Sequence, residues 1–399
     1  MNSRERVIAA LMHEEPDRVP VDLGGMFSTG IMGMAYNKLK AYLGIKGGRT
    51  RMYDLGQQLA EPEIEVLEMI GADVLPVLIE YPKRWKRSTL PDGSPCEVPY
   101  DFNPEVLPDG SKVIRDEEGR IIAKMPKDGY YYDGIYHPLE DAKTVEDLED
   151  YDFYKPIDEE IIRDLHGRAK NLYENTDYAL MLNGAGSVYE TAQGLLGWRN
   201  FMVKLIRDPE FIDVLLDKIV EANIKRLEKI LPAVNGYVQV VQVGDDLGMQ
   251  NGPQISPGHY REIIKPKHER LYRYIKEHID AFLFLHTCGS VYDFIPDLIE
   301  IGVDILNPVQ VSAKNMDTER LKEEFGERIT FWGGGCDTQR VLPFGTPKEV
   351  EKEVKKRIED LAPGGGFVFT QVHNIQAGVP PENIMAMYKA VKKYGKYPR

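Results

Sequence analysis

Eight short apolar runs, rich in β-branched and aromatic residues and bounded by turn residues, occur along the sequence and indicate buried β-strands. Segments with apolar residues at helical spacing separate most of them. Continuous apolar strands that alternate with helices favour a parallel sheet covered by helices, and eight strands close a (β/α)8 barrel. The eight runs are residues 18–24, 72–79, 178–186, 237–246, 281–288, 303–310, 329–336 and 366–374, and the clearest helical segments are 257–278, 291–302, 346–362 and 380–395.

An open, doubly wound sheet is the main alternative to a barrel. Such a sheet would carry a glycine-rich phosphate loop directly after its first strand. Residues 21–30, VDLGGMFSTG, contain glycines but not the GxGxxG spacing. We therefore predict the α/β class, with a (β/α)8 (TIM) barrel that forms a single domain over residues 1–399.

One stretch interrupts the alternation of strands and helices. Residues 83–138 contain two PDGS turns and short alternating segments such as SKVIRDEEGRIIAKM, which are hairpin signals. We predict an inserted antiparallel β excursion after the second strand, over the mouth or the side of the barrel. Its aromatic run YYYDGIY, at 130–136, could line a pocket for a flat ligand. The excursion could equally be a surface flap or the contact of a homodimer.

Composition and charge limit the classes of partner. The net charge of −14 repels nucleic acid, so no nucleic-acid partner is expected. No segment approaches about 18 consecutive apolar residues, and no membrane association is expected. The first twenty residues have an amphipathic-helix pattern without the apolar segment of a signal peptide, so we expect a cytoplasmic protein. Three cysteines cannot form a disulfide framework and favour free or metal-bound thiols.

Polar residues that follow the predicted strands should meet at one end of the barrel, where barrel enzymes have their active sites. His286 and Cys288 end the fifth strand and point to the same side, because side chains alternate along a strand. Cys336 ends the seventh strand. Histidine nitrogen and cysteine sulfur are zinc ligands, and three protein ligands leave a fourth position for water or substrate. The sequence thus favours a catalytic zinc site, with Asp246 or Glu190 as a possible fourth ligand.

The competing interpretation is structural: both cysteines would be small buried residues and His286 a hydrogen-bonded core histidine. His373, at the end of the eighth strand, could be a general acid, a residue that supports a metal ligand, or a hydrogen-bond donor to the substrate. It could also merely hydrogen-bond to loop backbone groups. Asp246 could orient a metal-bound histidine or cap a loop. Asn307 and Gln310, which end the sixth strand, are predicted to contact a cofactor.

Four segments resemble the uroporphyrinogen decarboxylase superfamily over nearly the whole chain outside 83–138. They are RERVIAALMHEEPDRVPVDLGG, DDLGMQNGPQISPGHYREIIKP, HTCGSVYDFIPDLIEIGVDILNPVQ and HNIQAGVPPENIMAMYKAV. The resemblance implies a (β/α)8 barrel. The decarboxylases of this family bind an acidic tetrapyrrole with arginines after the first strand, whereas this chain has no arginine between Arg18 and Arg49.

The other branch of the superfamily contains cobalamin-dependent zinc methyltransferases with a His-x-Cys and a later Cys. This chain resembles that branch through His286, Cys288 and Cys336. The resemblance implies transfer of a methyl group from a donor, with a methoxylated aromatic favoured, to the Co(I) corrinoid of a separate partner protein. Methyl transfer from the corrinoid to a thiol or pterin, and a decarboxylase-like lyase, are the alternatives.

Overall fold

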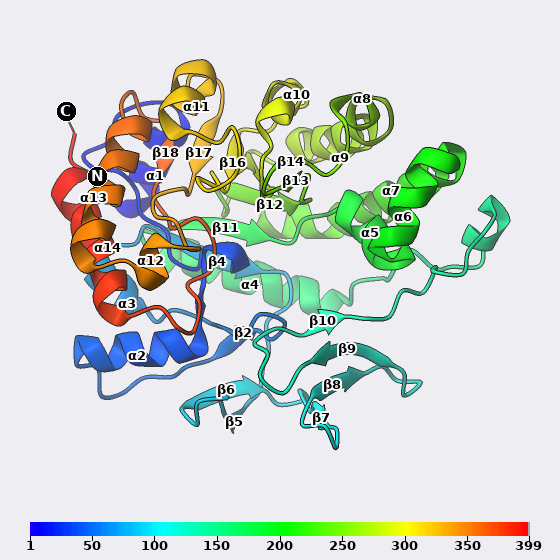
Figure 1. The fold of residues 1–399 in the computed structure, drawn as a ribbon, viewed down its shortest axis with the longest axis horizontal. Helices are drawn as coiled ribbons and strands as arrows, with labels where there is room; N and C mark the ends of the chain where they lie inside the picture. Colours follow the sequence, from blue (N-terminus) through cyan, green and yellow to red (C-terminus); the bar gives the residue numbers. More distant parts are fainter. Residues whose placement is uncertain (398–399) are drawn as a thin grey trace.

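A curled parallel sheet forms the centre of the computed structural model, which describes residues 1–397 (Figure 1). Seven strands lie in the order β4, β11, β12, β15, β16, β17, β18, which is also their order along the chain. Each neighbouring pair is parallel. Their bounds are Val74–Leu78, Ala179–Asn183, Val240–Gly244, Phe282–His286, Ile305–Asn307, Thr330–Trp332 and Phe367–Val368. All seven lie inside the apolar runs predicted as strands two to eight.

The first predicted strand closes the gap between β18 and β4. Val21 forms a parallel bridge with Phe369, and the N–H of Phe369 donates to the Pro20 carbonyl at 2.8 Å. On the other side, the N–H of Asp73 donates to the Val21 carbonyl at 2.7 Å. This segment is a bridge rather than a regular strand, in part because Pro20 has no N–H to donate. The (β/α)8 barrel predicted from the sequence is confirmed.

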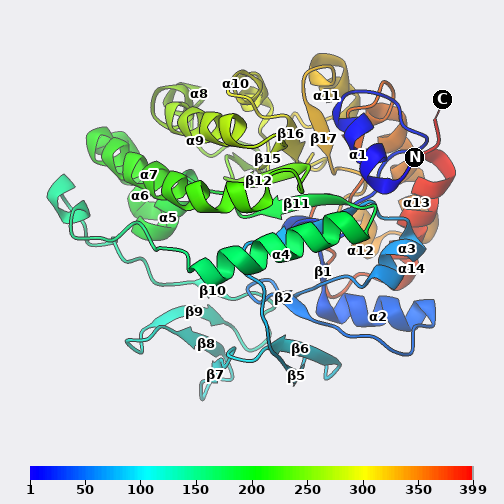
Figure 2. The same ribbon diagram turned by 180° about the vertical axis from the view of Figure 1, so that it is seen from behind.

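Helices cover the outside of the sheet, as Figures 1 and 2 show from opposite sides. Local signals set their ends. In α13, for example, Thr346 and Glu349 form a capping box and Pro347 occupies the first turn. Within residues 1–397, no helix has both the length and the apolar character that a membrane span requires. The helices are α1 (Ser3–Leu11), α2 (Gly33–Leu43), α3 (Ile64–Ile70), α4 (Glu159–Asn175), α5 (Tyr189–Leu196), α6 (Trp198–Arg207), α7 (Pro209–Val234), α8 (Pro257–His259), α9 (Lys265–His278), α10 (Ile295–Glu300), α11 (Thr318–Phe325), α12 (Val341–Phe344), α13 (Pro347–Leu361) and α14 (Pro381–Tyr394).

The interior of the barrel is a packed core. Inward side chains of the strands form one buried cluster, which includes Phe284, Trp332 and Met181. Val7 and Leu11 of α1 join the same cluster. Because this core is solid, the space for a ligand lies beyond the carboxyl ends of the strands.

The predicted excursion is antiparallel β structure. It contains the β5–β6 hairpin (Trp85–Thr89 and Pro95–Pro99) and a sheet of β7 (Glu105–Val106), β8 (Lys112–Arg115), β9 (Ile121–Met125) and β10 (Asp133–Gly134). It lies along the lower side of the barrel in Figure 1. A small sheet of β1 (Ile31–Met32), β2 (Met52–Asp54) and β3 (Leu59–Ala60), which the sequence did not predict, lies next to it. Leu90, Cys96 and Val98 of the excursion share a buried cluster with Met52, so the two parts pack together.

Candidate metal centre at the mouth of the barrel

Three side chains converge where the strands end. Among the described residues 1–397, one group of three His, Cys, Asp or Glu side chains has its ligand atoms within 4.8 Å of one another: His286, Cys288 and His373. The Sγ of Cys288 lies 3.4 Å from Nε2 of His286. The rings of His286 and His373 meet edge to face, with centroids 5.8 Å apart. Two imidazoles and one thiol form a ligand set that suits zinc.

The hydrogen bond to Asn307 sets the tautomer of His286. Its Nδ1 lies 2.6 Å from Oδ1 of Asn307, at the end of the neighbouring strand β16. The Nδ2 of Asn307 donates to the Trp332 carbonyl at 2.7 Å, so Oδ1 is the acceptor and Nδ1 of His286 carries the hydrogen. The lone pair is then on Nε2, which faces Cys288 and lies 3.3 Å from the hydroxyl of Ser28. A hydrogen bond of this kind fixes the tautomer and the ring orientation of a metal-binding histidine.

The loop after β15 holds Cys288 through its backbone. The N–H of Cys288 donates to Oδ1 of Asp246 at 2.7 Å, and the N–H of Gly289 donates to Oε1 of Gln310 at 2.7 Å. Burial raises the pKa of the Cys288 thiol well above its ordinary value, and the carboxylates of Asp246 and Glu190 raise it further. Without a cation the sulfur therefore stays a thiol, whereas a bound dication would favour the thiolate.

His373 is neutral in this environment. Burial lowers its pKa from 6.5 to about 3, and the neighbouring His286 lowers it further. A neutral imidazole can donate a lone pair to a metal. With so low a pKa, however, the ring is rarely protonated at neutral pH and is a poor general acid. The sequence predicted a pocket role for His373, and its position favours a metal ligand over a general acid.

The third ligand expected from the sequence, Cys336, lies elsewhere. Its Sγ donates to a carboxylate oxygen of Glu353 on α13 at 3.4 Å, and its side chain is buried between the sheet and the helices. Gly333 and Gly334 have φ angles of +102° and +78°, so the alternation of side chains ends directly after Trp332. The expectation assumed a regular strand up to residue 336. His373, which lay on the same predicted rim, takes the place of Cys336.

Two acidic side chains, Asp246 and Glu190, lie on one side of the mouth. Asp246 accepts the Cys288 N–H, and its Oδ1 also lies 3.8 Å from Nε2 of His286. Glu190, in the first turn of α5, is an exposed residue, although neighbouring protein atoms crowd its carboxyl group. Burial and the neighbours Asp246 and Asp245 raise the pKa of Glu190 to about 8. Asp245 itself is structural, because it accepts the N–H groups of Val188 and Glu190 at the start of α5.

Asn307 and Gln310, which were predicted to contact a cofactor, both hydrogen-bond to protein groups at the rim. Asn307 orients His286, as described above. Gln310 receives the Gly289 N–H and donates to Oε1 of Gln250 at 3.1 Å. Ser28, in the loop after the first strand, was not predicted as a site residue. Its hydroxyl contacts His286, which is 258 residues away in the sequence. No local sequence pattern could have predicted this contact.

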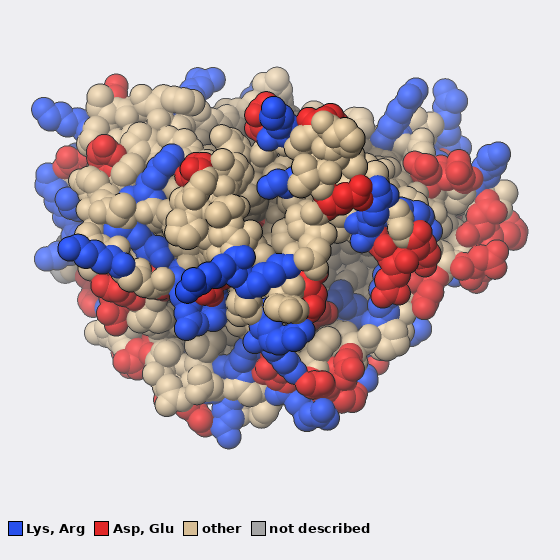
Figure 3. Space-filling view, turned by 90° about the horizontal axis from the view of Figure 1, so that it is seen from below, with Lys and Arg blue, Asp and Glu red and all other residues tan. Residues whose placement is uncertain are grey.

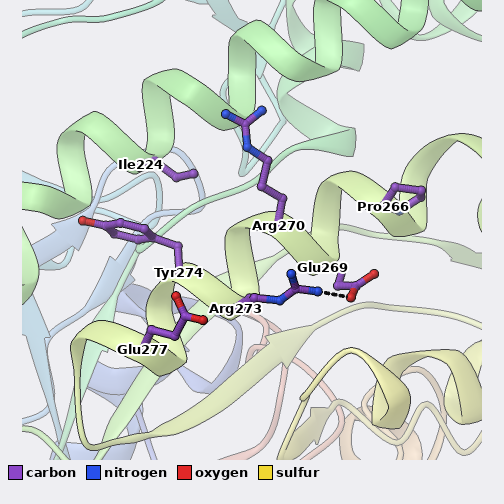
Figure 4. A pocket seen from close by; sticks show the side chains of 7 residues that line it. All are labelled: Ile224, Pro266, Glu269, Arg270, Arg273, Tyr274 and Glu277. Atoms are coloured by element: carbon purple, nitrogen blue, oxygen red, sulfur yellow. Dashed lines mark hydrogen bonds and ion pairs between the residues drawn. The ribbon is translucent and has the colours of Figure 1, made fainter.

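A hollow of about 410 Å³ lies away from the mouth, between α7 and α9 in the outer helical layer (Figure 4). Its arginines already have partners: Arg273 pairs with Glu269, and Arg270 lies 3.4 Å from Asp217. The three side chains that converge at the mouth, His286, Cys288 and His373 (the metal-ligand group), do not line this hollow. The mouth of the barrel is therefore the stronger candidate for chemistry.

The sequence model of the uroporphyrinogen decarboxylase (URO-D) family matches residues 135–394. This chain belongs to the uroporphyrinogen decarboxylase family. The matched region contains β11 to β18 and all three members of the metal-ligand group.

Members of the family and solved structures resemble this chain at low identity. The uroporphyrinogen decarboxylase of Alkalilimnicola ehrlichii is 24% identical over 291 residues, which are 70% of this chain and 73% of that one. That of Pseudoalteromonas atlantica is 25% identical over 192 residues, 47% of this chain and 49% of its own. A methyltransferase from Methanosarcina mazei superposes with a TM-score of 0.60 at 18% identity and covers 99% of both chains. At this identity the superposition shows a shared fold.

Proposed function

We propose that this member of the uroporphyrinogen decarboxylase family is a zinc-dependent methyltransferase. It would transfer a methyl group from a methylated donor, with a methoxylated aromatic as the first choice, to the Co(I) corrinoid of a partner protein. The observation that supports this proposal most is the convergence of His286, Cys288 and His373 at the mouth. The family relationship and the fold shared with a methyltransferase agree with it.

The residues present fit a zinc ion. Nε2 of His286 carries a lone pair, His373 is neutral, and Cys288 can lose its proton to a dication. Asp246 supplies negative charge beside them, which favours a cation. When bound, zinc would act as a Lewis acid on the donor oxygen and ease the departure of a phenolate.

The protein groups around this site would position and protonate the substrate. Asn307 fixes the ring of His286, and Asp246 fixes the backbone of Cys288. Glu190, with a pKa raised to about 8, holds a proton at its carboxyl group at neutral pH and could pass it to the leaving oxygen. A bound dication would lower this pKa, so Glu190 could alternatively be the anionic fourth ligand.

The carrier protein would meet this chain at the rim, where two large apolar side chains are exposed. Met249 on the β13–β14 hairpin (Gly248–Met249 and Gly252–Pro253) is 54% exposed, and Trp198 is 53% exposed. The hairpin contacts the loop 286–290, which contains Cys288 and is called the metal-site loop below. The N–H of Gly248 donates to the Cys288 carbonyl at 3.1 Å. Nε1 of Trp198 donates to Gln254, directly after the hairpin, at 3.3 Å. Exposed large apolar side chains beside a site are typical of protein contacts.

Decarboxylation is the second candidate, because the named relatives are uroporphyrinogen decarboxylases. Two features weigh against a polycarboxylate substrate: Arg18 lies at the opposite end of the barrel from the mouth, and the mouth itself carries a carboxylate, that of Asp246. The guanidinium of Arg18 is engaged with the buried carboxylate of Asp73 at 2.7 Å. In addition, the metal-ligand group lies beside the carboxylate of Asp246, which would repel the carboxylates of such a substrate.

The test is spectroscopic. Zinc-loaded protein is mixed with a Co(I) corrinoid carrier protein and a panel of methoxylated arenes, and formation of methyl-Co(III) is followed by its absorbance. We expect conversion by the wild type and by the control Cys96→Ser, and none by Cys288→Ser. Loss of methyl-Co(III) to a thiol or pterin would reverse the direction of transfer. Decarboxylation of uroporphyrinogen without any methyl transfer would overturn the proposal.

A further inference from the structure

A basic cleft lies on the face of the molecule that carries α2 and the β5–β6 hairpin. It has a volume of about 660 Å³ and lies between the end of α2, the loop 44–50 and the hairpin. Figure 3 shows this side, where Lys and Arg side chains gather across the middle. The chain as a whole carries a net charge of −14, so a local excess of positive charge is a distinct feature.

Three of the lining cations have no protein partner. Within residues 1–397, the side chains of Lys46, Arg49 and Arg87 make no hydrogen bond or ion pair. The carboxylates of the region are engaged elsewhere. Glu97 pairs with Arg51 at 3.1 Å, and Glu63 pairs with the buried Lys40 at 2.8 Å. The excess positive charge in the cleft is therefore available to a ligand.

The loop that borders the cleft has a set conformation. Gly48 has a φ of +87°, and a Cβ there would lie 2.3 Å from a carboxylate oxygen of Glu63. The same carboxylate accepts the Arg49 N–H at 2.7 Å. By contrast, the N–H groups of Lys46, Gly47 and Gly48 donate to no acceptor in residues 1–397. Successive free N–H groups in such a loop form a concave anion-binding surface.

A hydrogen-bonded floor joins the loop to the hairpin. The hydroxyl of the buried Thr50 donates to Oδ1 of Asn37 on α2 at 2.5 Å. Nδ2 of Asn37 in turn donates to the Pro95 carbonyl at 2.9 Å. The N–H of Glu97 donates to the Thr50 carbonyl at 2.8 Å. Because three elements hold this floor, the cleft is formed before any ligand binds.

We propose that this cleft binds a small organic or inorganic anion with two or more negative charges, such as a phosphorylated or polycarboxylated metabolite. Three unpaired cations and free loop N–H groups offer charge-assisted hydrogen bonds to phosphate or carboxylate oxygens. The volume lies in the range of small-molecule sites, roughly 300–1,000 Å³. A nucleic acid is disfavoured by the net charge of the chain. The site is separate from the metal centre, and the proposal does not depend on the methyltransferase activity.

Calorimetric titration of the full chain with pyrophosphate and with citrate, at low salt, tests the proposal. We expect saturable binding of at least one of them, and the preferred anion separates phosphate from carboxylate chemistry. Arg49→Ala and Arg87→Ala should each weaken binding by roughly tenfold. Arg163→Ala on α4 is the matched control, since Arg163 is an exposed arginine outside the lining. It should leave the affinity unchanged.

Two kinds of result would contradict the proposed anion site. Equal weakening by Arg163→Ala, or heats that never saturate, would show a general charge effect and overturn the site. Tighter binding of anionic vesicles or oligonucleotides, lost in Arg49→Ala, would overturn the assignment to a small molecule. A thermal melt of each variant ensures that a weakened affinity is not a consequence of unfolding.

Discussion

The hydrogen bond between Asn307 and His286 decides which ring nitrogen faces the mouth. Cys288 lies two residues further along the same strand end, and His373 arrives from the last strand of the barrel. Residue types alone identified two of these three side chains as candidate ligands. Only their coordinates separate His373 from Cys336 as the third.

The metal content of single variants tests this choice of ligands. We expect wild type to bind about one zinc ion per chain, as a three-ligand site does. Cys288→Ser and His373→Ala should lower the affinity by at least roughly 100-fold. Cys336→Ser should retain the metal, because its sulfur faces Glu353. Elemental analysis after dialysis measures this. Loss of zinc in Cys336→Ser, with retention in His373→Ala, would restore the ligand set expected from the sequence.

Asp22 predicts a pH dependence of stability. It is fully buried, accepts Nε1 of Trp332 at 2.9 Å, and burial raises its pKa from 3.8 to about 6. A raised carboxyl pKa stabilises the fold at pH below about 4, and this contribution is lost as pH rises through about 6. The difference corresponds to about 3 kcal/mol.

Urea unfolding of wild type and Asp22→Asn at several pH values measures this effect. The free energy of unfolding of wild type should fall relative to that of the variant between pH 4 and 7, because asparagine does not titrate. Parallel profiles would mean that Asp22 keeps an ordinary pKa in the folded protein.

At the scale of elements, the metal-site loop depends on its contact with the β13–β14 hairpin. Gly289 has a φ of +90°, and a Cβ there would lie 2.4 Å from the carbonyl carbon of Gly248. This distance is far below van der Waals contact, so one of the two backbones would have to move. The loop between residues 286 and 290 is therefore held in place by two glycines in contact.

Gly289→Ala should lower the free energy of unfolding by at least ~3 kcal/mol and weaken metal binding, because the clash adds to the backbone strain. Gly93→Ala is the control: it has a φ of +79° at the tip of the β5–β6 hairpin, but open space around it. It should cost only about 1–2 kcal/mol and leave metal affinity unchanged. Chemical denaturation and zinc titration of both variants give the comparison. Equal effects in both would show that the contact with Gly248 is unimportant.

At the scale of the whole molecule, a buried ion cluster secures the closure of the barrel. The carboxylate of Asp73 is completely buried before β4 and accepts the guanidinium groups of Arg6 at 2.8 Å and Arg18 at 2.7 Å. It also accepts the N–H of Val21 at 2.8 Å. These contacts tie α1 and the first strand to the second strand.

Asp73→Asn should destabilise the protein by about 3–5 kcal/mol, because it removes the only carboxylate partner that the partly buried Arg18 has among the described residues. It also removes one of the two carboxylate partners of the buried Arg6, which keeps the other. Glu359→Gln, which breaks an exposed pair with Lys355 on α13, should cost less than about 1 kcal/mol. Urea unfolding curves measure both. A small effect of Asp73→Asn would indicate that water or another group compensates the arginines.

Periodicity predicted most of the elements, because apolar runs and helical spacing are local properties of the chain. The runs at 281–288 and 303–310 contain β15 and β16, and 346–362 contains α13. The excursion followed from its turn residues. The β1–β2–β3 sheet was missed, since strands of two or three residues carry too few side chains to show a pattern.

The sequence by itself determined the eightfold alternation, the inserted β structure and a rim rich in soft metal ligands. The tertiary structure decided which rim residues meet. Two left-handed glycines turn Cys336 outward, while barrel closure brings His373 beside His286. The unpaired cations of the basic cleft likewise come from the loop after α2 and from a distant hairpin. Contacts across the barrel depend on how strands curl and close, and no spacing along one strand records that geometry.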